Sequence, residues 1–283
     1  MAKKSSKTSR RGRGSRFTAA TADRHELYQF SVQNTEQEIE VIEEAYRQRR
    51  GLRPMSLKED FCGTGLLCAA WVRSHPDRRA TGLDLDESVL AWGYERNIEP
   101  LGEDAARVDL RRQNVLEPVA ERFDVCVGMN FSYFIFRTRD ALRNYFQAAR
   151  ASLAEDGLLF LDCYGGWESQ EPMEEERKIE AGGLKHAFTY VWDQNTYNPI
   201  NGAATNHIHF RFRDGTAMER AFTYEWRLWS LPEIRELLFE AGFRQVDVLF
   251  EDEDEKGEEL GTHSARVEIE NQPGWLCYIV AER

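Results

Sequence analysis

No run of about 18 apolar residues occurs in this sequence, so it lacks the segment that a membrane-spanning helix requires. The first residues also lack the apolar stretch of a secretory signal peptide. These two absences argue against a membrane or secreted protein, and we expect a cytoplasmic one. The length of 283 residues is sufficient for one large domain, or for one domain with a substantial insertion.

Cysteines are few: the five present are scattered, odd in number and mostly set in apolar runs. Their spacing matches neither a disulfide framework nor a zinc site, so we expect reduced thiols and no metal. The sequence also lacks a Ser-His-Asp or Cys-His constellation, which disfavours a hydrolase.

Basic residues are unevenly placed along the chain. Seven of the 37 Lys and Arg residues lie between Met1 and Arg16, so the remainder is more acidic than the net charge of −12 indicates. An acidic body repels nucleic acid and suits neutral or cationic small molecules, or basic proteins. We predict that residues 1–22 form a disordered basic arm, the one part suited to tethering nucleic acid.

The strongest motif is a strand, a glycine turn and a helix, written in that order from Leu57 to Val72. Gly63 and Gly65 let the turn bring backbone N–H groups close to a ligand, and the helix directs its positive end to the same place. A second strand, Arg79 to Asp84, ends in an acid, the usual partner of ribose hydroxyls. Cys68 replaces the third glycine of the dinucleotide motif, which disfavours NAD.

On these residues the sequence resembles the class I S-adenosylmethionine-dependent methyltransferases, whose first strand ends in an acid followed by a G-x-G turn. Glu59 matches that acid, residues 62–65 match the common C-G-T-G ending, and Asp84 matches the acid of the second strand. Phe61 departs from the commoner glycine, and the neighbouring Asp60 leaves open which carboxylate faces the ligand. The resemblance implies S-adenosylmethionine as the cofactor.

Further cofactor contacts are implied at later strand ends. The apolar strand from Phe123 ends at Asn130, where the family places its fourth motif beside the sulfonium and the methyl acceptor. No proline follows, unlike in the methyltransferases that act on nucleic-acid amino groups. Asn114 matches a residue that meets adenine, although a simple turn explains it equally well. The implied cofactor set is Tyr28, Glu59, Asp60, Cys62, Gly63, Gly65, Asp84, Leu85, Asn114, Val115, Asn130 and Phe131.

Strand and helix patterns alternate over residues 23–163, which predicts a doubly wound, mostly parallel α/β sheet with helices on both faces. The resemblance implies seven strands in this Rossmann-like core. Residues 164–229 interrupt the alternation with three segments of period two, which predict an inserted antiparallel sheet resembling a substrate lid. We expect residues 171–176, within this insertion, and residues 251–259, after it, to form loops. Residues 230–283 should close the core with a helix and a β-hairpin.

Methyl transfer from a sulfonium requires a positioned, deprotonated acceptor rather than a protein nucleophile. The candidate bases are Tyr133, His207, His209 and Tyr224, and a structural role is the alternative for the two histidines, which share one face of their strand. The aromatic residues of the inserted sheet either line a pocket for a cation or form a packing layer. These residues are Tyr190, Trp192, Tyr224, Trp226 and Trp229.

The predicted function is methyl transfer from S-adenosylmethionine to nitrogen or oxygen of a small molecule. Two alternatives remain open at this point. One is a methyltransferase for RNA or a basic protein, delivered by the basic arm, and the other is an inactive methyltransferase-like binding protein. The expected partner is a neutral or cationic small acceptor, with no membrane and with nucleic acid only through the arm.

Overall fold

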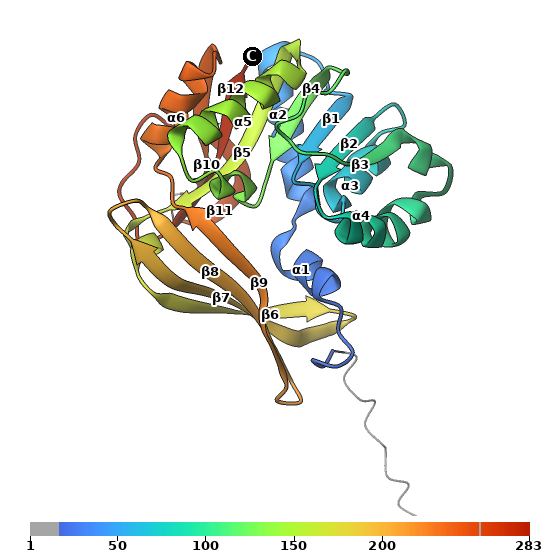
Figure 1. The fold of residues 1–283 in the computed structure, drawn as a ribbon, viewed down its shortest axis with the longest axis vertical. Helices are drawn as coiled ribbons and strands as arrows, with labels where there is room; N and C mark the ends of the chain where they lie inside the picture. The colour runs from blue at the N-terminus through green and yellow to red at the C-terminus, as the bar shows by residue number, and fades with distance from the viewer. Residues whose placement is uncertain (1–16, 255) are drawn as a thin grey trace, which may run out of the picture.

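The computed structural model describes residues 17–254 and 256–283 as two sheets, one large with helices on both faces and one small (Figure 1). None of the helices in these ranges is long and apolar enough to cross a membrane. The predicted α/β class is therefore confirmed, and the small sheet lies below the large one in Figure 1.

The large sheet has eight strands in the order β11-β10-β12-β5-β4-β1-β2-β3. Strands β1 to β5 are parallel, whereas β10, β11 and β12 are antiparallel to their neighbours. Parallel strands direct their carboxyl ends to one edge, where ligands bind in such sheets. The strands are β1 (Ser56–Asp60), β2 (Arg79–Asp84), β3 (Val108–Arg112), β4 (Phe123–Gly128), β5 (Leu153–Gly165), β10 (Gln245–Glu253), β11 (Glu259–Ala265) and β12 (Trp275–Glu282).

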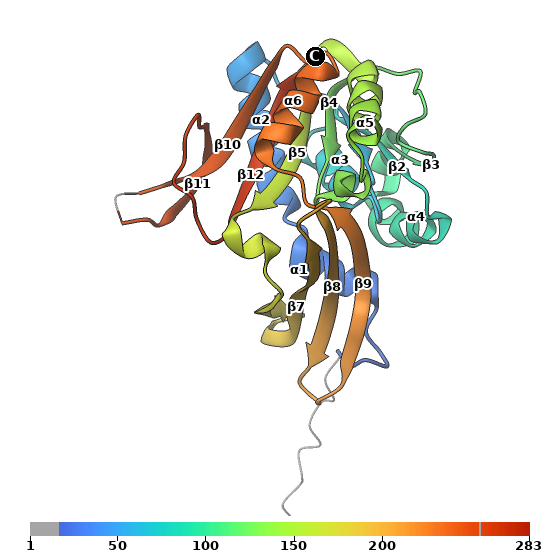
Figure 2. The same ribbon diagram turned by 60° about the vertical axis from the view of Figure 1, so that its left-hand side comes forward.

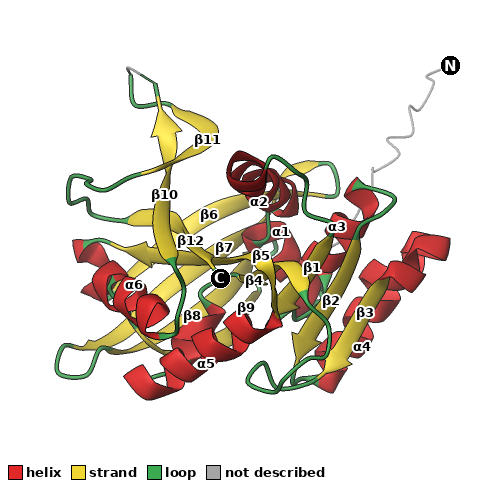
Figure 3. Ribbon diagram, turned by 90° about the horizontal axis from the view of Figure 1, so that it is seen from above, coloured by secondary structure: helices red, strands yellow, loops and turns green. Residues whose placement is uncertain are grey.

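Helices cover both faces of this sheet (Figure 3). Buried residues of α2 and α3 pack on one face, and those of α5 and α6 pack on the other. The α-helices are α1 (Arg24–Val32), α2 (Thr35–Arg50), α3 (Leu66–Ser74), α4 (Glu87–Gly93), α5 (Arg139–Ser152) and α6 (Leu231–Glu240). Shorter π or 3₁₀ turns are η1 (Tyr94–Ile98), η2 (Glu99–Arg107), η3 (Ser132–Ile135) and η4 (Trp167–Gln170).

Local sequence signals fix several helix starts. Ser230 and Glu233 form the predicted capping box of α6, in which each side chain accepts a hydrogen bond from the other residue's backbone N–H. Asp86 caps α4 by accepting hydrogen bonds from two backbone N–H groups of its first turn. These caps orient the helices that follow β2 and β9.

The small sheet contains β6 (Met173–Ala181), β7 (Leu184–Asn198), β8 (Ala203–Phe212) and β9 (Ala217–Arg227). We predicted three strands and a loop over residues 171–176, and that prediction is wrong at β6. Glu174 and Glu176 pair across the sheet with Arg211, and this charge pairing stabilises a strand whose sequence lacks apolar alternation. Charged residues also suit β6 because it is an edge strand.

The loop predicted over residues 251–259 is also shorter than expected. Strand β10 continues to Glu253, and β11 begins at Glu259 and pairs antiparallel with it. This hairpin adds an eighth strand to the seven that we predicted, and Figure 2 shows it extending outward from the body.

The predicted basic arm falls mostly on residues 1–16, which lie outside the described residues. Phe17, however, is 1% exposed and packs against Phe188 of β7 and Phe30 of α1. The segment 17–22 therefore belongs to the folded part of the chain, in contrast to the predicted boundary.

Candidate functional site

The glycine turn after β1 has the geometry that its sequence predicts. Gly63 and Gly65 have φ values of +52° and +62°, a region that favours glycine. The Gly63 N–H donates to Oδ2 of Asp84 at 2.8 Å, so the end of β2 holds the turn. A side chain added at Gly63 would meet no atom closer than 4.0 Å, which leaves open space in front of the turn.

Phe61 occupies a third left-handed position in this segment, with φ +58°. Its ring packs against Tyr145 and Phe136, at 5.5 and 6.1 Å between ring centroids. The departure from glycine is therefore accommodated by aromatic packing, which offsets a backbone strain of about 1 kcal/mol.

The two carboxylates at the end of β1 point to opposite faces, as alternate residues of a strand do. Asp60 accepts a hydrogen bond from Nζ of Lys58 at 2.5 Å and another from the Tyr145 hydroxyl at 3.3 Å, all within the core. Glu59 instead accepts from the N–H of Cys68, in the first turn of α3, at 3.2 Å. Asp60 is thus engaged within the core, and the role of Glu59 as the motif acid remains a prediction.

A second turn, at the end of β4, is built from Asn130 and Phe131, which have φ values of +57° and +56°. Asp162 of β5 holds both residues: its carboxylate accepts from the Asn130 N–H at 2.7 Å and from the Phe131 N–H at 2.8 Å. The Tyr133 hydroxyl donates to the backbone oxygen of Asp162 at 2.8 Å, and Tyr133 is fully buried. Burial raises the pKa of Tyr133, so this residue supports the turn and is not a candidate base.

The other residues of the implied cofactor set lie in different environments. Cys62 and Val115 are 2% and 5% exposed and contribute to the core, whereas Leu85 is 63% exposed. Asn114 makes the turn that we weighed as its alternative role, because its Oδ1 accepts from the N–H of Leu116 at 3.0 Å. A direct cofactor contact remains a prediction for Leu85 and Asn114.

Helix α1 bridges the glycine turn and the small sheet. Gln29 donates from Nε2 to the Thr64 hydroxyl at 2.8 Å, at the turn. Tyr28 contacts Phe222 at 5.0 Å between ring centroids, and its hydroxyl lies close to that of Tyr224, in the small sheet. Helix α1 therefore lies over the glycine turn at the carboxyl end of β1.

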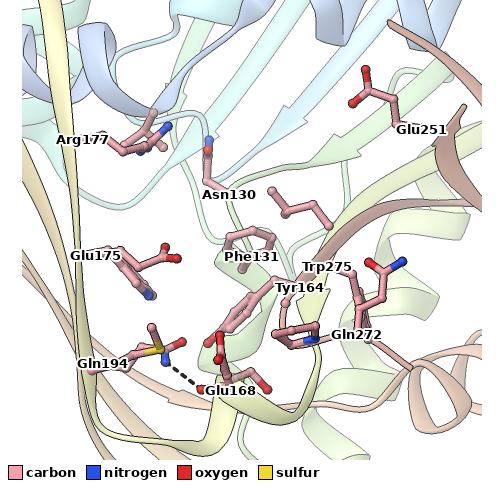
Figure 4. Close-up of a pocket in the computed structure, with 18 of the residues that line it drawn as sticks. Asn130, Phe131, Tyr164, Glu168, Glu175, Arg177, Gln194, Glu251, Gln272 and Trp275 are labelled. Atoms are coloured by element: carbon pink, nitrogen blue, oxygen red, sulfur yellow. Dashed lines mark hydrogen bonds between the residues drawn. The ribbon is translucent and has the colours of Figure 1, made fainter. Parts of the chain in front are cut away.

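A cavity of about 770 Å³ opens between the small sheet, α1 and the β10–β12 edge. Asn130 and Phe131 lie in its wall, whereas no residue of the glycine turn does. Figure 4 shows Asn130 between Glu175 on one side and Glu251 on the other. Aromatic residues line much of it: Tyr28, Phe131, Tyr164, Tyr190, Trp192, Tyr224, Trp226, Phe250 and Trp275.

The predicted aromatic residues of the small sheet both line this cavity and pack against each other. Trp226 lies 4.5 Å from Tyr224 and 6.1 Å from Trp192 between ring centroids. Trp229 is the exception, because it is 1% exposed and donates from Nε1 to the Phe136 oxygen in the core. Tyr190, Trp192, Tyr224 and Trp226 therefore line a cavity, whereas Trp229 only packs, and a pocket for a cation remains a prediction.

His207 and His209 lie on the opposite face of β8 from the cavity. Their neighbours Asn206 and Ile208 pair with Tyr224 and Phe222 on the cavity side. His207 contacts the Thr223 hydroxyl at 2.9 Å, and His209 is bracketed by Glu219 and Asp193. The structure does not bring either histidine to the cavity, so we no longer retain them as bases; of the four candidates only Tyr224 lines it.

Three carboxylates near the edge of the large sheet have no cationic partner among the described residues. Burial raises the pKa of Glu59 to about 8, and raises the pKa values of Asp162 and Glu38 to about 7. Asp162 is a residue that the sequence analysis missed, because a single acid within the apolar run 158–163 gives no signal beyond its position at a strand end.

These pKa values predict an unusual pH dependence of stability. The unfolded carboxylates ionise at lower pH, so between about pH 5 and 8 the folded state binds more protons. Stability should therefore rise as the pH falls from 8 to 7, by at most about 1.4 kcal/mol per unit for Glu59. Thermal unfolding at both pH values measures this effect, and Glu59→Gln should reduce it. An unchanged slope in that variant would contradict the assignment.

No protein-family model and no curated protein sequence matches the chain significantly. Solved structures do match it. An S-adenosylmethionine-dependent methyltransferase from Clostridium acetobutylicum is 16% identical, with a TM-score of 0.66 over 91% of this chain and 96% of the other. The S-adenosylmethionine-bound amino pentose methyltransferase CalS10 from Micromonospora echinaspora is 15% identical, with a TM-score of 0.63 over 92% and 95%. The sugar N-methyltransferase KedS8 from Streptoalloteichus is 16% identical, with a TM-score of 0.61 over 100% and 98%. At these identities the comparison shows the fold.

Proposed function

Since the chain has the fold of class I S-adenosylmethionine-dependent methyltransferases, we propose that it transfers a methyl group from S-adenosylmethionine to an amino nitrogen of a small molecule. The observation that carries this proposal is the placement of the Asn130–Phe131 turn. It lies at the carboxyl end of β4, in the wall of the acidic, aromatic cavity.

The cofactor half of the proposal rests on the turn after β1. The open space before Gly63 suits the amino-acid part of the cofactor, and the Asp84 carboxylate, already held by the Gly63 N–H, suits the ribose hydroxyls. The cofactor carries a sulfonium and an ammonium group. Burial favours the neutral forms of Glu59, Glu38 and Asp162, which have no cationic partner among the described residues, and a cationic ligand would favour their ionisation.

The acceptor half rests on the cavity. Carboxylates and aromatic faces in one wall attract an ammonium ion, or a neutral amine in equilibrium with it. Two of the similar structures are described as an amino pentose methyltransferase and a sugar N-methyltransferase, which supports an amine on a sugar. The similar structures do not favour the alternatives of an RNA or protein substrate or of an inactive protein.

The bound cofactor would supply an electrophilic methyl group, and the chain has to orient the amine. The lone pair of the neutral amine forms the new N–C bond as the S–C bond breaks, and the proton of the amine passes to solvent or to a wall carboxylate. The hydroxyls of Tyr28 and Tyr224 place two polar groups of the chain at the cavity wall.

Incubation with S-adenosylmethionine and D-glucosamine, followed by mass spectrometry, tests the proposal. We expect a methylated amine that depends on both substrates. Product from glucose, which has the same ring without the amine, would instead indicate an O-methyltransferase.

Asp162→Asn should impair catalysis more than folding. An asparagine can accept only one of the two backbone N–H bonds, and its NH₂ group would face the second donor, so the Asn130–Phe131 turn should loosen. We expect kcat/KM for the amine to fall at least about tenfold, with a small change in melting temperature. Equal losses in activity and stability would show that Asp162 serves only the fold.

A further inference from the structure

We infer that the acceptor carries at least two charged amino groups and no phosphate group. This inference rests on the proposed function, because it concerns the acceptor cavity of the same site. The inference narrows the acceptor from any amine to a diamine, and it excludes acceptors in which the amine is attached to a nucleoside diphosphate.

The charges of the cavity wall carry the first step. Five glutamates line the cavity: Glu168, Glu175, Glu251, Glu253 and Glu259. Within residues 17–254 and 256–283, none of them has an ion-pair partner, whereas their neighbours Glu174 and Glu176 both pair with Arg211. The five carboxylates of the cavity wall therefore carry charge that no salt bridge among the described residues neutralises.

The two arginines of the wall offset only a small part of this charge. Arg266 pairs with Asp252 at 2.7 Å. Arg177 donates to the neutral Ser31 oxygen at 3.0 Å and lies 4.8 Å from the centroid of the Tyr190 ring, so it keeps its positive charge. A phosphate entering the cavity would therefore face the five glutamates and one unneutralised guanidinium group.

The carboxylates lie on separate walls. Figure 4 shows Glu175 on the β6 side and Glu251 on the β10 side, with Asn130 between them. An ammonium group placed against one of these walls leaves the carboxylates of the other wall without a cation. An acceptor with two amino groups can present one to the Asn130–Phe131 turn and place the other against a carboxylate further along the wall.

The remaining wall suits a sugar ring between the two amines. Trp192, Tyr224 and Trp226 provide apolar faces for ring carbons. Asn206, 2% exposed, lies on the same side of the small sheet between Gln194 and Tyr224. Asn206 does not itself line the cavity, but Gln194 and Tyr164 do, and their polar groups can contact a ring hydroxyl.

The test compares three probes at low ionic strength by calorimetry, with the protein saturated in S-adenosylhomocysteine. The probes are D-glucosamine, the β-1,4-linked glucosamine disaccharide, which has two amines, and uridine diphosphate glucosamine. We expect the disaccharide to bind at least about tenfold more tightly than glucosamine, because a second ion pair forms in a partly buried site. The diphosphate should bind more weakly than glucosamine.

Matched variants identify the wall that holds the second amine. Glu175→Gln and Glu251→Gln should each reduce the ratio of the disaccharide affinity to the glucosamine affinity. In at least one of these variants, the ratio should fall to about threefold or less. Glu174→Gln is the control, because Glu174 neighbours Glu175 on β6 but faces Arg211 on the other side. It should leave the preference unchanged, and all three variants should bind S-adenosylhomocysteine as the unsubstituted protein does.

Equal binding of glucosamine and the disaccharide, absence of binding by either, or tight binding of the diphosphate would overturn the inference. Equal effects of the three substitutions would overturn it as well. Failure of the proposed function is a different result: S-adenosylhomocysteine itself would then not bind, before any sugar is added.

Discussion

Gly63→Arg should abolish binding of S-adenosylhomocysteine while the protein remains folded. The site of the substitution is open, since an added Cβ meets only Val89 at 4.0 Å, so an arginine side chain extends into the space in front of the turn. That space is where the proposed cofactor lies. We expect the affinity for S-adenosylhomocysteine, measured by calorimetry, to fall by more than about 100-fold. The positive φ at residue 63 should lower the free energy of unfolding by only about 1 kcal/mol.

Gly51→Arg provides a matched control for this prediction. Gly51 ends α2 with φ +69° and also has no atom within 4 Å of an added Cβ. The Gly51→Arg substitution therefore imposes the same backbone strain at a place distant from the glycine turn. Both variants should lose similar stability, and only Gly63→Arg should lose binding. Parallel losses of binding in the two would show that strain, rather than a filled site, is the cause.

Lys58→Met should destabilise the fold strongly. The Lys58 and Asp60 side chains are 1% and 0% exposed and form an ion pair at 2.5 Å. Removing the lysine leaves a buried carboxylate without its charge partner, which costs about 3 to 5 kcal/mol in comparable cases. Urea unfolding monitored by tryptophan fluorescence measures this loss.

The double variant Lys58→Met, Asp60→Leu distinguishes a lost charge partner from lost packing. With both charges removed, no uncompensated carboxylate remains, so the double variant should be more stable than Lys58→Met alone. If the two variants are equally unstable, the cost arises from packing around residue 58 and the ion-pair explanation is wrong.

The parts of the fold that were predictable are those whose sequence carries a periodic or a positional signal. The glycine turn, the apolar strands such as β4 and β5, and the capped helix α6 follow from local patterns. Strand β6 did not, because its stability comes from pairing with Arg211, a residue distant in the sequence. The end of β10 and all of β11 were missed because their run of acids hides a local hairpin, in which Thr262, Ser264 and Arg266 hold Asp252.

The residues of the candidate site also fall into two groups, those that could be predicted from the sequence and those that could not. Gly63, Gly65 and Asp84 could be placed because a motif fixes their spacing. The positions of His207 and His209 could not be predicted, since period two shows that two residues share a face and does not show which face is inward. Asp162 could not be found either, because its role depends on the backbone of residues 130 and 131, which are adjacent only in the folded sheet.

Calorimetric titration of the unsubstituted protein with S-adenosylhomocysteine tests the central claim most directly, because the product contains every part of the proposed cofactor except the methyl group. The account predicts saturable binding to a single site. Absence of binding at hundreds of micromolar ligand, in a protein that circular dichroism shows to be folded, would contradict it.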